Sequence, residues 1–135
     1  FLNKLRYPYK APCNGTSSQG TALCMDIEAY LETLKKLAAV DIVNIISAHP
    51  YLDTGSIALG RQESSRYLDQ CREIVDRYEK YIGEQLKKGV DDPVQLAQGL
   101  IAFLGNEKPK WLFLPLYTVT SIMEHLQRTA KIKGE

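Results

Sequence analysis

The pattern of hydrophobic and polar positions along the chain predicts a protein that is mainly helical. In four stretches the apolar side chains recur at intervals of three and four residues, which places them on one face of an α-helix. We expect these four helices at about residues 26–39, 62–88, 93–104 and 115–130. Helices would then cover well over half of the chain, against about one third in an average globular protein.

Polar and turn-forming residues at the ends of these stretches support the helix limits. Asp26 precedes the first stretch and Asp92 precedes the third. Aspartate is a favoured N-cap residue, and Pro93 suits the first position of a helix because proline lacks the N–H that would have no partner there. Gly89 follows the long second stretch, and glycine commonly ends a helix.

A different pattern at residues 40–47 predicts one strand. This segment is short and rich in β-branched apolar residues, namely Val40, Ile42, Val43, Ile45 and Ile46. Such a run is typical of a strand that is buried on most of both faces. A single strand cannot form a sheet. Its partner must therefore come from residues 1–24, from another copy of the chain or from sequence outside the chain.

The remaining segments predict loops. Residues 48–60 contain His49-Pro50 and Asp53-Thr54-Gly55, which favour turns. Prolines and a cluster of small polar residues make residues 1–24 irregular. The chain is thus a single domain or fragment with an irregular segment at 1–24, a helix, strand and loop at 25–60, and helices at 61–135. The expected fold class is α+β, dominated by helices.

Composition narrows the possible functions. The chain has 135 residues, of which 44% are hydrophobic and 24% are charged, and its formal net charge is +1. The hydrophobic fraction argues against a disordered chain. The balanced charge argues against nucleic-acid binding, although Lys4, Arg6 and Lys10 alternate with tyrosines near the start. Apolar stretches fall short of the roughly 20 residues that span a membrane. Three widely spaced cysteines predict reduced thiols in the cytoplasm.

Two histidines are the main candidates for chemistry. The chain has no HxH, HExxH, Walker or GxSxG motif, so the sequence alone encodes no complete active site. His49 follows the predicted strand, and functional groups of α/β folds gather at the carboxyl ends of strands. The alternative is a loop histidine that caps the strand end. His125, between Glu124 and Leu126, is expected at the surface or at the core boundary.

The order of motifs resembles a known family. Residues 26–37 form a helix that contains Glu28, Tyr30-Leu31 and Leu34, and the apolar strand leads into Ser47-Ala48-His49-Pro50. A long helix rich in Arg and Glu, then Gly89, Gln95-Leu96-Ala97 and His125-Leu126 follow in order. This combination, over residues 21–135, resembles the C-terminal half of metallo-β-lactamase superfamily proteins. Ala48 and Pro50 stand where the family usually has glycines.

The resemblance implies a complete protein with a four-layer αββα sandwich and a zinc or iron site. His49 would correspond to the last metal ligand of the family, and the other ligands would lie upstream of this chain. Tyr51 and Asp53 would line the substrate cleft. A bound metal lowers the pKa of its water ligand and so supplies hydroxide at neutral pH. No cofactor is expected in this chain alone.

Two functions remain open at this point. In the first, the chain is the C-terminal fragment of a metal-dependent hydrolase, is not catalytically complete and has the missing N-terminal half of the same fold as its partner. A start at Phe1 rather than at methionine fits a fragment. An unpaired strand would also make the fragment a homo-oligomer. The alternative is a small, non-catalytic helical module that binds other proteins, with aromatic residues at its interface.

Overall fold

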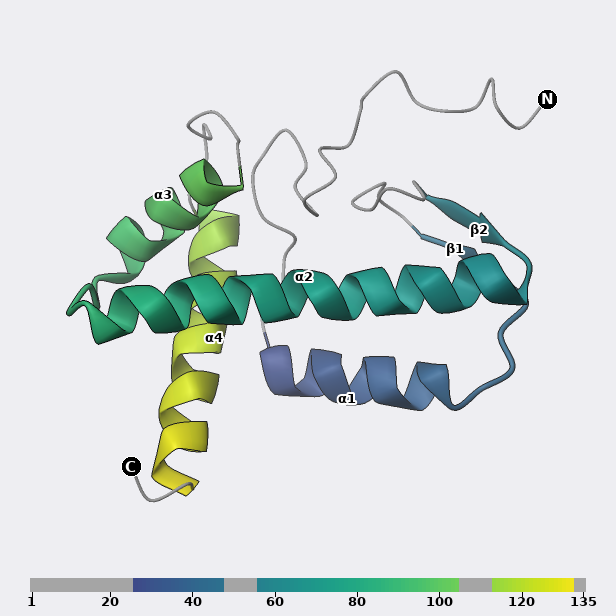
Figure 1. Ribbon diagram of the computed structural model, residues 1–135, viewed down its shortest axis with the longest axis horizontal. Coiled ribbons are helices and arrows are strands. Elements are labelled where there is room, and N and C mark those ends of the chain that lie inside the picture. Colours follow the sequence, from purple (N-terminus) through teal and green to yellow (C-terminus); the bar gives the residue numbers. More distant parts are fainter. Residues whose placement is uncertain (1–25, 48–55, 105–112, 133–135) are drawn as a thin grey trace.

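A computed structural model shows a helical protein with one small sheet (Figure 1), and it describes residues 26–47, 56–104 and 113–132. In chain order the elements are α1 (Ile27–Ala38), β1 (Asn44–Ile46), β2 (Ile57–Leu59), α2 (Arg61–Lys87), α3 (Pro93–Phe103) and α4 (Phe113–Ile132). The four predicted helices are confirmed to within two residues at each end. The fold class is therefore α+β and dominated by helices, as the sequence predicts.

The long helix α2 is the element against which the others pack. It crosses the whole molecule in Figure 1, with α1 running alongside it and the hairpin of β1 and β2 at its N-terminal end. Helices α3 and α4 lie at its C-terminal end, where α4 crosses α2 and also contacts α1 and α3. No helix in these described ranges is both long enough and apolar enough to cross a lipid bilayer.

Side-chain caps fix the starts of two helices where the sequence predicts them. The Asp26 carboxylate accepts a hydrogen bond from the Ala29 N–H, and the Asp92 carboxylate accepts one from the Gln95 N–H, each at 3.0 Å. Each bond satisfies one of the N–H groups that a helix leaves without a backbone partner in its first turn. Pro93 stands directly after Asp92 at the first helical position.

The sheet differs from the prediction in its length and in its partner. The strand expected at residues 40–47 is only Asn44–Ile46, and it pairs in antiparallel register with Ile57–Leu59. That partner lies inside the segment that the sequence predicted as a loop. β2 has three residues between Gly55 and Gly60, which is too short for a period-two pattern to stand out from turn residues.

The prediction that this strand is buried on both faces is also wrong. Successive side chains of a strand point to opposite faces, and only one face of the hairpin is covered. Ala58 is buried and Ile45 is half-buried on the face toward α2. The opposite face, which we call the outer hairpin face, carries the exposed apolar side chains of Ile46, Ile57 and Leu59, and Ile46 is 80% exposed.

One hydrophobic core joins all four helices. Its buried side chains are Ile27 from α1, Val75, Tyr78 and Ile82 from α2, Leu96, Ala97 and Leu100 from α3, Leu104 after α3, and Val119 and Ile122 from α4. Gly99 lets α3 approach α2 closely, because a Cβ atom at this position would meet the Tyr81 hydroxyl. The Tyr81 ring stacks on Phe103 with a centroid distance of 4.8 Å. The core therefore sits where α3 and α4 meet the second half of α2.

Replacing a fully buried side chain of α2 should test this core. Ile82 has no exposed surface, so we expect Ile82→Ala to lower the free energy of unfolding by about 2–5 kcal/mol, through lost burial and the cavity left behind. The exposed Lys80 on the same helix provides a control, since Lys80→Ala should change the value by less than about 0.5 kcal/mol. Urea denaturation followed by circular dichroism measures both. Equal stabilities of the two variants would contradict the packing described here.

Candidate functional site

The residues that the sequence singled out for a site lie outside the described residues. His49, Tyr51 and Asp53 belong to residues 48–55, so the structure does not test their assignments. The chain on either side of this segment is described. The Ser47 N–H donates a hydrogen bond of 2.8 Å to the Ser56 carbonyl, so the segment that carries His49 leaves and rejoins the hairpin at adjacent points.

Three side-chain contacts fasten β1 to the start of α2. The buried Ser64 hydroxyl donates to the Val43 carbonyl at 2.9 Å. The Asn44 side-chain oxygen accepts a hydrogen bond of 3.0 Å from the Gly60 N–H. The Tyr67 hydroxyl hydrogen-bonds to Ser47 and, because partial burial outweighs that bond, the pKa of Tyr67 is raised. We call this set of contacts the hairpin brace, and it holds the strand end that leads to His49.

Gly60 makes the brace possible through its backbone conformation. Its φ of 87° lies in the left-handed region, which residues with a side chain rarely adopt. The chain thus turns directly from β2 into α2, and the Gly60 N–H points to Asn44. A single residue, Gly60, therefore separates the end of β2 from the start of α2.

A shallow cleft of about 220 Å³ lies beside the brace, between the end of α1, residues 40–42 and the first turns of α2. The Arg61 guanidinium at its edge donates two hydrogen bonds to Asp41, of 2.7 Å and 2.9 Å. This pairing lowers the pKa of the Asp41 carboxyl. Both side chains remain exposed to solvent, at 68% for Arg61 and 69% for Asp41.

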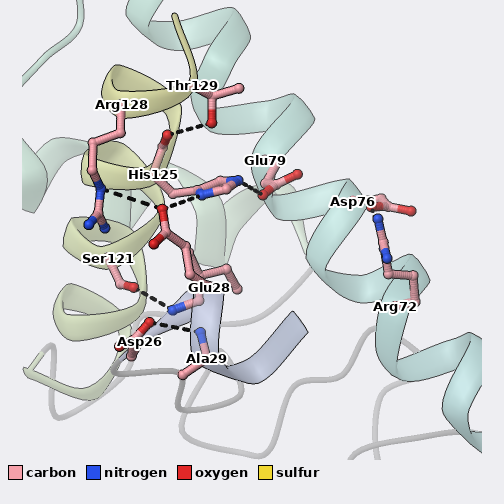
Figure 2. Close-up of polar contacts among 11 residues, drawn as sticks. Asp26, Glu28, Ala29, Arg72, Asp76, Glu79, Ser121, His125, Arg128 and Thr129 are labelled. Atoms are coloured by element: carbon pink, nitrogen blue, oxygen red, sulfur yellow. Dashed lines mark hydrogen bonds and ion pairs between the residues drawn. The ribbon is translucent and has the colours of Figure 1, made fainter. Parts of the chain in front are cut away.

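A second polar site lies where α1, α2 and α4 meet. We call it the His125 cluster and define it as Glu28, Glu79, His125 and Arg128. Figure 2 shows the His125 ring between two carboxylates from different helices. Its Nδ1 atom lies 3.1 Å from Glu28 Oε1 and its Nε2 atom lies 3.4 Å from Glu79 Oε1, while Arg128 Nε lies 3.4 Å from Glu28 Oε1.

The electrostatics of this cluster centre on Glu79. Burial raises the pKa of the Glu79 carboxyl, and Asp76 adds to the rise, while His125 and Arg72 oppose it. The Glu79 Oε1 atom is enclosed and forms no hydrogen bond. Its 3.4 Å contact with the imidazole is therefore an ion-pair distance rather than a well-formed hydrogen bond. His125 is 23% exposed, which is the boundary position that the sequence predicts.

Neither of these two sites provides the ligands of a metal centre, and Cys71 lacks the environment of a reactive nucleophile. Within residues 26–47, 56–104 and 113–132, no three His, Cys, Asp or Glu side chains are placed to hold a metal ion. The Glu28 and Glu79 carboxylates contact different nitrogens of one imidazole ring, so their oxygens do not converge on a single point. Cys71 is half-buried, and burial raises the pKa of its thiol, which disfavours the reactive thiolate.

Comparisons of the whole chain with protein-family models, with curated proteins and with solved structures find no match. The case for any function consequently depends on the residues and geometry described above.

The hairpin brace can be tested through its buried hydroxyl. Ser64→Ala should lower the free energy of unfolding by about 1 kcal/mol, because the hydrogen bond between the buried Ser64 hydroxyl and the Val43 carbonyl is lost. The neighbouring Ser65 is exposed, so Ser65→Ala should change stability by less than about 0.5 kcal/mol. Denaturant titration of both variants measures the difference. A Ser64→Ala protein as stable as Ser65→Ala would show that the brace contributes nothing.

Proposed function

We propose that this chain forms the C-terminal part of a metal-dependent hydrolase of the metallo-β-lactamase superfamily, in which His49 is a metal ligand. The observation that carries the proposal is the hairpin brace, which fixes Ser47 to Tyr67 of α2 two residues before His49. A metal ligand must be held in a defined position, and a strand end tied to a long helix provides such a support.

The outer hairpin face gives the proposal a second support. Ile46, Ile57 and Leu59 are exposed on a sheet of two short strands, and a two-stranded sheet by itself is marginally stable in water. Further strands and a second sheet would bury these side chains in the sandwich that the resemblance implies. The proposed partner of the chain is accordingly the N-terminal half of the same fold.

The metal ion, zinc or iron, would be held mainly by residues outside this chain. The described residues do not offer a set of ligands, so we assign no catalytic step to them. In the proposal His49 supplies one ligand, and Tyr51 and Asp53 line the substrate cleft. We place the protein in the cytoplasm, because the chain carries an odd number of widely spaced cysteines and the Cys71 thiol is free.

The two histidines of the chain allow a matched test of the ligand assignment in the natural full-length protein. His49→Ala should weaken metal binding by more than about 10-fold, since loss of even an indirect ligand partner typically costs 10–100-fold. It should leave the thermal midpoint of the metal-free protein nearly unchanged. His125→Ala should do the opposite, because His125 joins helices and lies in no proposed metal site. Elemental analysis and thermal unfolding of both variants measure the two effects.

Unchanged metal stoichiometry in His49→Ala, combined with a lowered thermal midpoint, would refute the assignment. His49 would then be a structural residue of the loop. The chain by itself should show no hydrolysis of a chromogenic lactam, a thioester or a phosphodiester when zinc is added. Turnover by residues 1–135 that disappears in His49→Ala would show that the chain is catalytically complete, which contradicts the proposal in another way.

The alternative function is a non-catalytic interaction module, and the same outer hairpin face favours it. Exposed apolar side chains beside open strand edges are a surface on which another chain can add. In this second proposal the module forms a homo-oligomer through the hairpin. The chain would then need no N-terminal half, and its function would be binding alone.

A charged substitution on the outer hairpin face tests this alternative. If the hairpin mediates self-association, Ile46→Lys should convert an oligomer of residues 1–135 into a monomer at micromolar concentration, because burying an unpaired ammonium group at an interface is costly. Light scattering with size-exclusion chromatography measures the mass. Lys80→Asp, on the exposed side of α2, provides the control. A monomeric wild-type chain would rule out self-association through the hairpin.

A further inference from the structure

We propose that the His125 cluster is a proton-dependent clasp that fastens α1 and α2 to α4 and loosens as the pH rises. Its parts come from three helices: Glu28 from α1, Glu79 from α2, and His125 with Arg128 from α4 (Figure 2). The inference does not depend on the proposed hydrolase function, because none of these residues belongs to the proposed metal site.

The hydrogen-bonding capacity of an imidazole ring carries the proposal. Both ring nitrogens of His125 face a carboxylate oxygen, at 3.1 Å and 3.4 Å. A neutral imidazole has a single N–H, so its other nitrogen would turn a lone pair toward an oxygen lone pair. Both contacts become attractive only when the cluster holds one more proton, either on the ring or on a carboxylate. A proton-bound cluster accounts for both contacts.

The charges around the ring leave Glu79 dependent on that proton. On α4, Arg128 pairs with Glu28 of α1, which leaves Glu28 a second cation. On α2, Arg72 pairs with Asp76 at 3.4 Å, and both are exposed. Among the residues that the structure describes, Glu79 forms its ion pair with His125, and Arg72 adds a further favourable charge. Burial raises the pKa of the Glu79 carboxyl, in agreement with a site that retains a proton.

Loss of the proton should loosen one attachment of α1 without unfolding the protein. The Ile27 N–H at the start of α1 also donates a hydrogen bond of 2.8 Å to the buried Ser121 hydroxyl of α4. The Ile27 side chain remains in the core as well. The clasp residue of α1, Glu28, follows Ile27 directly. Release of the clasp therefore affects α1 after Ile27, while the bond between Ile27 and Ser121 remains.

The direction of the pH effect follows from proton linkage. The geometry of the folded cluster calls for one more proton than the separated side chains need in the unfolded chain. Where the folded state binds more protons, stability falls as the pH rises. The raised pKa of Glu79 acts in the same direction. Its contribution to the free energy of unfolding is complete below the ordinary pKa of a glutamate. The contribution disappears as the pH rises through the pKa that Glu79 has in the folded protein. The clasp therefore contributes at mildly acidic pH and weakens toward alkaline pH.

Thermal unfolding of residues 1–135 between about pH 5.5 and about pH 8.5 tests the clasp. At the acidic end we expect the midpoint of His125→Gln to lie about 2–8 °C below that of the wild type. The gap should close by at least half at the alkaline end. Glu79→Gln is the second variant, because its amide can donate to a neutral imidazole and needs no extra proton. Its midpoint should be less dependent on pH than that of the wild type.

Two controls separate the clasp from other titrating groups. Asp41→Asn breaks the exposed pair with Arg61 and should leave the pH dependence between these limits unchanged, because the lowered pKa of Asp41 places its titration below them. His49→Gln removes the other histidine of the chain and should also preserve the wild-type dependence. Midpoint curves of wild type, His125→Gln and Glu79→Gln that run parallel over the whole range would overturn the proposal. A pH dependence that disappears in His49→Gln would overturn it equally.

Discussion

The apolar stripe along α2 is the constraint on which the rest of the structure depends. An isolated helix is marginally stable in water, and most helices in proteins are stabilised by packing one face. In α2 that face is used along nearly its whole length. Tyr67 contacts the end of β1, while Val75, Tyr78 and Ile82 form part of the core with α3 and α4. The hairpin and the helical core are separate contacts of one rigid helix, which is why a two-stranded sheet keeps a fixed place in the fold.

The two strands of the hairpin pair with each other, and two side-chain hydrogen bonds connect the ends of this small sheet to the start of α2. Ser64 provides the donor for the Val43 carbonyl, and Asn44 provides the acceptor for the Gly60 N–H. No described residue covers the outer hairpin face in this way, and Ile46 is 80% exposed. Contiguous exposed apolar side chains are a feature of binding surfaces. Both proposed functions therefore assign it a partner, and they differ in whether that partner belongs to the same fold.

The helices were predictable from the sequence because their determinants are local. The caps at Asp26 and Asp92 act over three residues, and the apolar repeat of α2 lies within one continuous segment. β2 was not predictable, because its three residues are recruited by register with β1 and by contact with α2. The His125 cluster was beyond sequence reasoning for the same reason. Glu28 and His125 are 97 positions apart, and no spacing rule connects them. The placement of His49 remains a prediction from its motif.

The position of the charged cluster also bears on what it does for the fold. An ion pair is weak evidence for stability, because exposed pairs contribute little and well-packed apolar residues often replace buried ones without loss. Apolar contacts, however, do not fix the orientation of a helix in the way that hydrogen bonds do. Leu34 and Ile27 would pack against α2 and α4 over a range of rotations of α1, whereas the Ile27 N–H must reach Ser121 and Glu28 must reach His125. These two contacts lie within one turn of each helix, and together they fix both the depth and the rotation of α1. α1 ends six residues before β1, and the short connection between them carries Asp41 and Val43. The rotation of α1 therefore influences where these two residues meet the first turns of α2.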